Sequence, residues 1–287
     1  MGRELRMARE AAGVSMVDAA ELLKRDASGI SRSETGTFPL PHTDVEALLG
    51  LYRVTGDERA ALTKLSEEVW RTDWWDGYAG DVERSFVDYV WLESRATGIR
   101  SFCITAFDGL LQTPAYARAI VRAAHPAESE QKIERWVELR LQRQAVLERA
   151  QPPRISTVVD EAALHRPVGG AAVLAAQLRR LVDQAARPHI EVRILPAAGG
   201  AHASPDGAFR IFELTDPYPE VACVESPAGQ LYLEPPKSAR FLTTYDWLED
   251  AALTPGESAQ RMASIAYELE KQDKHDQHHA HEHEVDR

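Results

Sequence analysis

Residues 15–36, SMVDAAELLKRDASGISRSETG, predict two short helices joined by a tight turn. Ser15 and Asp18 form a Ser-x-x-Asp pattern that is typical of a helix start, and Asp26 can cap the second helix. Ala20 occupies the position at which the first helix would pack closely on the second. This spacing predicts a helix–turn–helix unit.

A helix–turn–helix unit can read DNA with a small set of side chains. The amino end of its first helix, near Ser15, would direct backbone amides at a phosphate. The second helix would enter the major groove, and the side chains that it offers to base edges are Ala27, Ser28, Ser31 and Arg32. Arg32 can form two hydrogen bonds with a guanine edge, whereas Arg6 and Arg9 on the preceding helix can reach only phosphates.

A helical bundle that only forms dimers is the alternative interpretation of this region. The first 35 residues contain six basic and six acidic side chains, so they form no basic stripe. One further helix precedes the unit and two follow it, the first of these opened by a capping box of Thr43 and Glu46. Five short helices therefore predict a compact all-α domain over residues 1–70.

Residues 71–81 break the helical period and are interpreted as a linker, in which Trp74 and Trp75 dock the domains together. Helices and strands alternate over residues 82–272 and predict an α/β domain. The strands are expected at IRSFCITAF (99–107), RISTVVD (154–160), HIEVRILP (189–196), AFRIFEL (208–214), EVACVES (220–226) and QLYLE (230–234). The last two strands, joined by a Pro-Ala-Gly turn, favour a mixed, largely antiparallel sheet with flanking helices.

Two other features of this domain concern its helices and its end. Residues 128–150 predict one long helix, on which Arg135, Arg140 and Arg143 are interpreted as a solvated face. Residues 273–287 are rich in histidine and lack an apolar anchor, so we expect this tail to be disordered and to form no designed metal site.

Composition limits the classes of function. The chain has 287 residues and a net charge of −12, which argues against a protein that coats nucleic acid through a global positive field. No stretch approaches about 20 apolar residues, and the amino terminus is charged where a signal peptide is apolar. With only two cysteines, far apart, the sequence favours a cytoplasmic protein without a membrane span or a disulfide framework.

The α/β domain shows no fingerprint of catalysis. His202, Ser204 and Asp206 lie in one Gly-rich loop, but no motif supplies a positioned base, so they are interpreted as a ligand or partner contact. The carboxylates at the expected strand ends, Asp160, Glu161, Glu225 and Glu234, are interpreted as solvated. We expect no enzyme, no cofactor and no metal, because no phosphate loop, metal box or nucleophile motif is present.

Longer stretches carry a resemblance to known families. Residues 2–36, GRELRMAREAAGVSMVDAAELLKRDASGISRSETG, resemble the lambda-repressor-like helix–turn–helix of the xenobiotic-response-element regulators. The segments FDGLLQTPAYA (107–117), RLQRQ (140–144), VDEAAL (159–164), VGG (168–170) and residues 225–234 resemble the effector-like domain of WhiJ-like actinobacterial regulators. The resemblance covers residues 2–270.

This resemblance implies a DNA-binding transcriptional regulator that acts as a homodimer on double-stranded DNA. Its second domain would sense a small-molecule effector or hold a small neighbouring protein. An antitoxin-like or adaptor role is an alternative, and a ligand-binding protein or enzyme with a dimerising helical domain is another.

The sequence departs from the family pattern at several positions. Lys24 replaces the usual turn glycine, Ala27 the glutamine that opens the recognition helix, and Ser33 an apolar residue near its end. Residues 37–39, Thr-Phe-Pro, stand in place of a basic run, and Asp108 stands where the family has proline.

Overall fold

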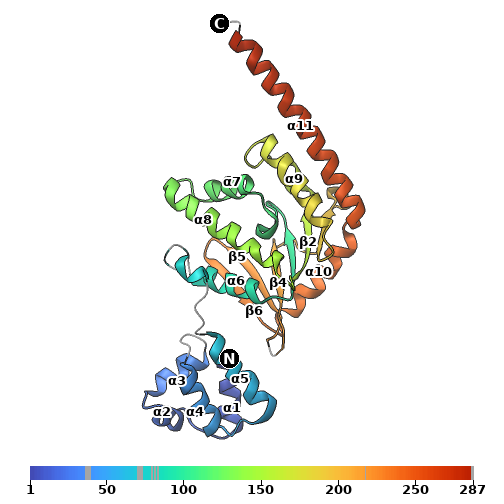
Figure 1. Ribbon diagram of the computed structural model, residues 1–287. Coiled ribbons are helices and arrows are strands. Elements are labelled where there is room, and N and C mark those ends of the chain that lie inside the picture. The colour runs from blue at the N-terminus through green and yellow to red at the C-terminus, as the bar shows by residue number, and fades with distance from the viewer. Residues whose placement is uncertain are drawn as a thin grey trace. The chain divides into compact units, whose positions relative to one another are not determined.

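The computed structural model describes residues 1–35, 40–69, 74–78, 80, 82, 84–216 and 218–285. The chain divides into two compact units, Met1–Trp74 and Trp75–Arg287 (Figure 1). The division falls inside the expected linker at 71–81. Across the described ranges, no helix has both the length and the apolar character needed to span a membrane.

The amino-terminal unit is helical, as predicted. Its described helices are α1 (Gly2–Ala11), α2 (Met16–Leu22), α3 (Ala27–Glu34), α4 (His42–Leu51) and α5 (Gly56–Val69). The core takes one or more apolar side chains from each of them, including the fully buried Leu5, Ala19, Ile30, Val45 and Leu62. The unit therefore closes around a small core of its own, with α2 and α3 packed on each other.

The helix starts of this unit follow the sequence in two of three cases. Ser15 and Asp18 form the expected capping box at α2, and the Asp26 carboxylate accepts from the Gly29 amide at α3. The capping box expected from Thr43 and Glu46 does not form, because α4 begins earlier with Pro41 as its N-cap. The Glu46 carboxylate instead accepts hydrogen bonds from Arg59 and Thr63 of α5.

The second unit is built on one mixed sheet of six strands, which confirms the expected class. The strands are β1 (Gly98–Cys103), β2 (Arg154–Asp160), β3 (Ile190–Leu195), β4 (Phe209–Glu213), β5 (Val221–Ser226) and β6 (Gly229–Leu233). Their order is β3-β2-β1-β4-β5-β6. The pairs of β1, β2 and β3 are parallel, and the pairs that involve β4, β5 and β6 are antiparallel.

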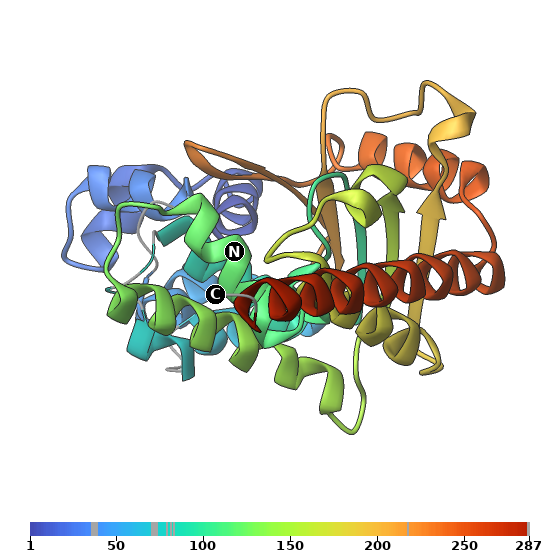
Figure 2. The same ribbon diagram turned by 90° about the horizontal axis from the view of Figure 1, so that it is seen from above.

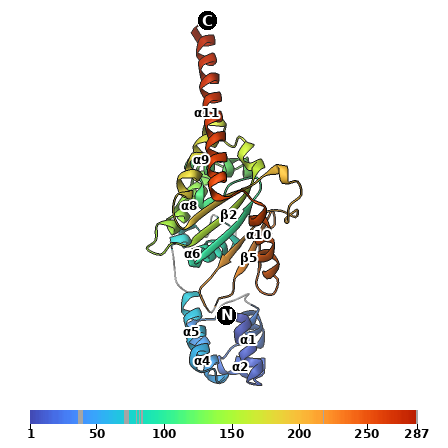
Figure 3. The ribbon, with the colours of Figure 1, turned by 90° about the vertical axis from the view of Figure 1, so that its right-hand side faces the viewer.

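Helices cover both faces of this sheet. They are α6 (Arg84–Arg95), α7 (Pro114–Ala124), α8 (Glu130–Arg143), α9 (Ala171–Ala185), α10 (Ala239–Ala251) and α11 (Pro255–Val285). Alternation along β1 sends Ile99 and Cys103 to the larger core, which α6, α9 and α11 help to form, and Phe102 to the smaller core beneath α10. Figure 3 shows α10 on the opposite face of the sheet from α6, α8 and α9.

Two helices differ from the sequence expectation. The helix expected over 128–150 ends at Arg143, and a 3-10 helix over Gln144–Glu148 follows it. At this point the side-chain amide of Gln144 donates to the Gly109 and Gln112 carbonyls. In place of disorder from residue 273, α11 continues to Val285. It packs along α9 over its first half (Figure 2).

Candidate functional site

The α2–α3 turn of the amino-terminal unit contains a strained backbone position. Lys24 has a φ of 51°, in the left-handed region that favours glycine. This is the position at which the resemblance leads one to expect a turn glycine. The turn therefore has the geometry of a helix–turn–helix, although a lysine side chain occupies its tightest point.

The exposed face of α3 is the first candidate site. Ser28 and Arg32, four residues apart, are both exposed, whereas Ile30 and Ser33 are buried. Within the described residues the Arg32 guanidinium makes no hydrogen bond or ion pair, but the Ser28 hydroxyl donates to Asp26 at 2.5 Å. The face thus presents one unengaged cation beside a small polar side chain.

Four other residues expected at the DNA surface differ in exposure and in hydrogen bonding. Ala27 and Ser31 are half-buried on α3. Arg6 is exposed on α1 and pairs with Glu10 at 2.8 Å. The Ser15 hydroxyl is engaged in the capping box, where it donates to Asp18 at 2.7 Å.

Arg9 is not available to a phosphate, contrary to expectation. It is 7% exposed, and its Nε and Nη2 atoms donate to the two carboxylate oxygens of Glu34 at 2.6 and 3.0 Å. Its third donor group binds the Val14 carbonyl at 3.0 Å. Arg9 therefore ties α1 to the end of α3, and Glu34, twenty-five residues away, is the reason that it is buried.

In the α/β unit, charged side chains from α6, α8 and the sheet form a buried network. Arg143 Nε and Nη2 bind the two Glu93 oxygens at 2.8 and 2.7 Å. Arg210 Nη2 binds Asp108 Oδ2 at 2.6 Å, and its Nη1 lies 3.3 Å from Glu93 Oε2 and also donates to the Tyr89 hydroxyl. These charged residues are all buried, so the expected solvated face at Arg143 is wrong.

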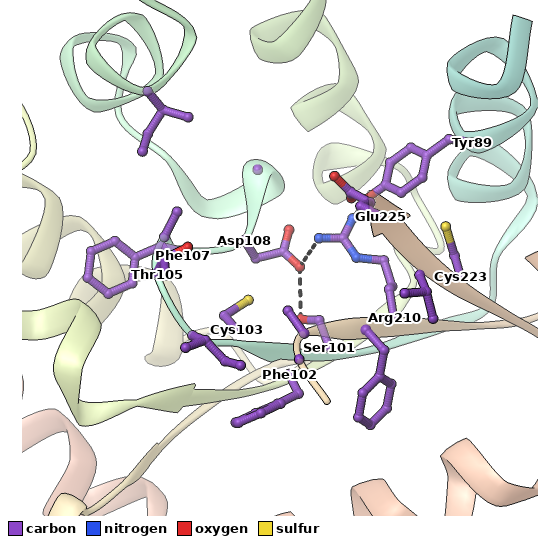
Figure 4. Close-up of a pocket in the computed structure, with 18 of the residues that line it drawn as sticks. Tyr89, Ser101, Phe102, Cys103, Thr105, Phe107, Asp108, Arg210, Cys223 and Glu225 are labelled. Carbon is purple, nitrogen blue, oxygen red and sulfur yellow. Dashed lines mark hydrogen bonds and ion pairs between the residues drawn. The ribbon is translucent and has the colours of Figure 1, made fainter. Parts of the chain in front are cut away.

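Asp108 joins this network to the sheet. Its carboxylate accepts from the Ser101 hydroxyl and from the Leu110 amide, each at 2.9 Å (Figure 4). Burial raises the pKa of Asp108 to about 6, because removal from water disfavours the charged form. Arg210, a charged residue in the middle of the apolar run AFRIFEL, was the one sequence signal that could have revealed this network.

A cavity of about 330 Å³ opens beside the network. Arg140, Gln112 and Glu225 line it together with Arg143 and Arg210, and its walls also carry apolar side chains. The Arg140 guanidinium donates to Gln112 Oε1 at 3.0 Å, which is its one hydrogen bond among the described residues. Burial, followed by the like charge of Arg143, lowers the pKa of Arg140 to about 10.

Of the loop residues expected to act together, His202 and Ser204 are joined by a hydrogen bond from the Ser204 backbone amide to His202 Nδ1 at 3.2 Å. Ser204 and Asp206 line a second cavity of about 470 Å³, and Asp206 also borders the first. The Ser204 hydroxyl donates to the Gly207 carbonyl at 2.7 Å, so it is not paired with a base. His202 stands edge-on to Phe102, with its Nε2 atom 4.0 Å from Asp160 Oδ2.

The strand-end carboxylates differ in their surroundings. Glu161 accepts from Arg261 of α11 and from the Ala197 amide after β3, so it joins these two segments instead of being solvated. Glu225 is exposed and makes no hydrogen bond or ion pair within the described part of the chain. No group of three metal-ligating side chains is present among the described residues.

Comparison with known proteins agrees with this geometry. Residues 1–62 match a helix-turn-helix domain, which defines the class of the amino-terminal unit. Residues 86–264 match the family described as a domain of unknown function (DUF5753), and because this match covers more than half of the chain, the chain belongs to that family. No curated protein and no solved structure matches the chain.

Proposed function

We propose that this protein is a sequence-specific DNA-binding transcriptional regulator. The observation that carries the proposal is the exposed face of α3, where Arg32 projects from a helix–turn–helix without a hydrogen bond or ion pair among the described residues. A guanidinium left unpaired on the second helix of such a unit is suited to a guanine edge in the major groove.

The proposed contacts follow from burial and charge. Arg32 would form two hydrogen bonds with a guanine, and Ser28 and Ala27 would lie against neighbouring base edges. Arg6, which is exposed, would exchange Glu10 for a phosphate. Arg9 is left out of the interface because its guanidinium already binds Glu34.

The α/β unit is proposed to bind an effector or a small protein partner and to carry no catalysis. Its cavities support a binding role, and the Ser204 hydroxyl donates to the Gly207 carbonyl and not to a histidine. The resemblance to xenobiotic-response-element and WhiJ-like regulators supports a dimer in which this unit supplies the contact between copies. An antitoxin-like role would replace the effector by a small neighbouring protein.

The test begins with selection of a preferred duplex from random DNA by the purified protein. Arg32→Ala should weaken binding to the selected duplex by roughly 1–3 kcal/mol, which is about 5- to 150-fold, and should relax preference at one base pair per half-site. On a randomised duplex the loss should be much smaller. Arg6→Ala should weaken both duplexes alike and reduce the salt slope by about one unit.

Arg118→Ala, which removes an exposed arginine of α7, is the matched control and should change neither affinity. An equal loss for Arg32→Ala on both duplexes would mean that Arg32 touches only the backbone. No loss on either duplex would remove α3 from the DNA interface.

A further inference from the structure

Arg140 differs from the other two arginines that line the 330 Å³ cavity. Arg143 is held by both oxygens of Glu93, and Arg210 is held by Asp108 and Glu93. Arg140 has only the neutral side-chain oxygen of Gln112 as a hydrogen-bond partner in the described part of the chain. Its charge is therefore the one in this set that no carboxylate neutralises by direct contact.

Among the described residues, Arg140 is the cation at the cavity wall that lacks a carboxylate in direct contact. The guanidinium groups of Arg140, Arg143 and Arg210 stand against the buried carboxylates of Glu93 and Asp108. Glu225 and Asp206 also line the cavity, and the Glu225 charge acts on Arg140 from a distance, but the Glu225 carboxylate makes no ion pair within the described residues. An uncompensated charge in a partly buried site is costly, so an anion that entered the cavity would gain more there than on an open surface.

The walls of the cavity indicate what the rest of such an anion would be. Phe86, Ile104, Phe107 and Ile120 contribute apolar surface. A volume of about 330 Å³ lies at the lower end of the range for small-molecule sites, which is roughly 300–1,000 Å³. Because Arg140 lacks a direct carboxylate contact in the described ranges and apolar side chains form part of the lining, the cavity is suited to a ligand with one anionic group and an apolar body.

We propose that this cavity binds a small organic carboxylate whose carboxylate group accepts hydrogen bonds from Arg140. The planar guanidinium matches a carboxylate in two parallel hydrogen bonds. Glu225 and Asp206, which also line the cavity, oppose a doubly charged phosphate more strongly than a monoanion. The role of this molecule as an effector rests on the proposed DNA-binding function, but its binding does not.

The proposal is tested on the full chain with benzoate, phenylacetate and 4-methylpentanoate, each compared with its neutral amide and with inorganic phosphate. At least one acid should raise the midpoint of thermal unfolding in a saturable way, and its amide and phosphate should not. Isothermal titration should give one site per chain. If none of the acids binds, or if phosphate or the amides bind as well, the proposal is overturned.

Variants locate the site. Arg140→Gln should weaken binding of the acid at least tenfold, whereas Lys132→Gln, which removes a positive charge from α8 outside the cavity lining, should leave it unchanged. Arg140→Lys keeps the charge but removes the planar pair of donors, so it should weaken binding of the acid several-fold. If Arg140→Gln does not fold, Arg140→Lys is the variant that tests the contact. Unchanged affinity in the folded Arg140 variant would overturn the assignment.

The affinity for the selected duplex is measured in parallel, with and without the acid. A chain that binds an acid but no duplex contradicts the proposed function and leaves the carboxylate site standing. A chain that binds the duplex but no acid contradicts the site alone.

Discussion

Lys24 shows how one residue departs from the requirement of its turn. A left-handed φ costs a residue with a Cβ atom about 1–2 kcal/mol, and glycine avoids that cost but loses more entropy on folding. Lys24→Gly should therefore raise the free energy of unfolding of the amino-terminal unit by about 0.5–1 kcal/mol, measured by urea denaturation. Lys24→Ala, which keeps the Cβ atom, should give no gain. Equal stability of the two variants would show that the turn is not strained.

Asp108 is a single residue that makes the free energy of unfolding depend on pH. Its pKa is raised by burial from 3.8 to about 6, so the stability that it contributes is complete below about pH 4 and is lost as the pH rises through 6. Asp108→Asn does not titrate. The difference in unfolding free energy between variant and wild type should therefore shift in favour of the variant by roughly 2 kcal/mol between pH 4 and 7. A difference that stays constant over this interval would contradict the raised pKa.

At the scale of elements, the start of α1 lies close to the end of α3. A Cβ atom at Gly2 would lie 2.4 Å from the Ser33 carbonyl oxygen, which is backbone and cannot turn away. Gly2→Ala should lower the unfolding free energy by about 1–3 kcal/mol through this overlap. Gly50→Ala in α4, where a Cβ atom meets no atom within 4 Å, is the control and should raise stability by up to about 1 kcal/mol. An unchanged unfolding free energy in Gly2→Ala would show that the first turn of α1 can shift to accommodate the Cβ atom.

At the scale of the whole molecule, the proposed function requires two copies. A single helix–turn–helix buries too little surface for tight specific binding, and the net charge of −12 adds no general attraction to DNA. We expect sedimentation to show a dimer of about 64 kDa, twice the 31.9 kDa chain, that protects two half-sites about 10 base pairs apart. A strict monomer with and without DNA would contradict this arrangement.

The elements and their class could be predicted from the sequence, because the signals for them are local. The caps at Ser15 and Asp26 involve partners three residues away, and the structure confirms both of them. Alternation and helical periodicity likewise predicted the strands of the mixed sheet and the helices around them. The exposed pair Ser28 and Arg32 on α3 followed from the same periodicity.

Which charged side chains are available to a ligand depends on contacts between elements that are far apart in the sequence. Arg9, Arg143 and Arg210 are each buried against a carboxylate. The carboxylates lie 25, 50 and 102 residues away along the chain, so local sequence patterns do not reveal the pairs. Helical periodicity predicted the same solvated face for Arg140 and Arg143. Of these two arginines, only Arg143 forms an ion pair with Glu93 within the described residues. The burial of a charge depends on whether a counter-charge from a distant element reaches it, and that is a property of the packed fold.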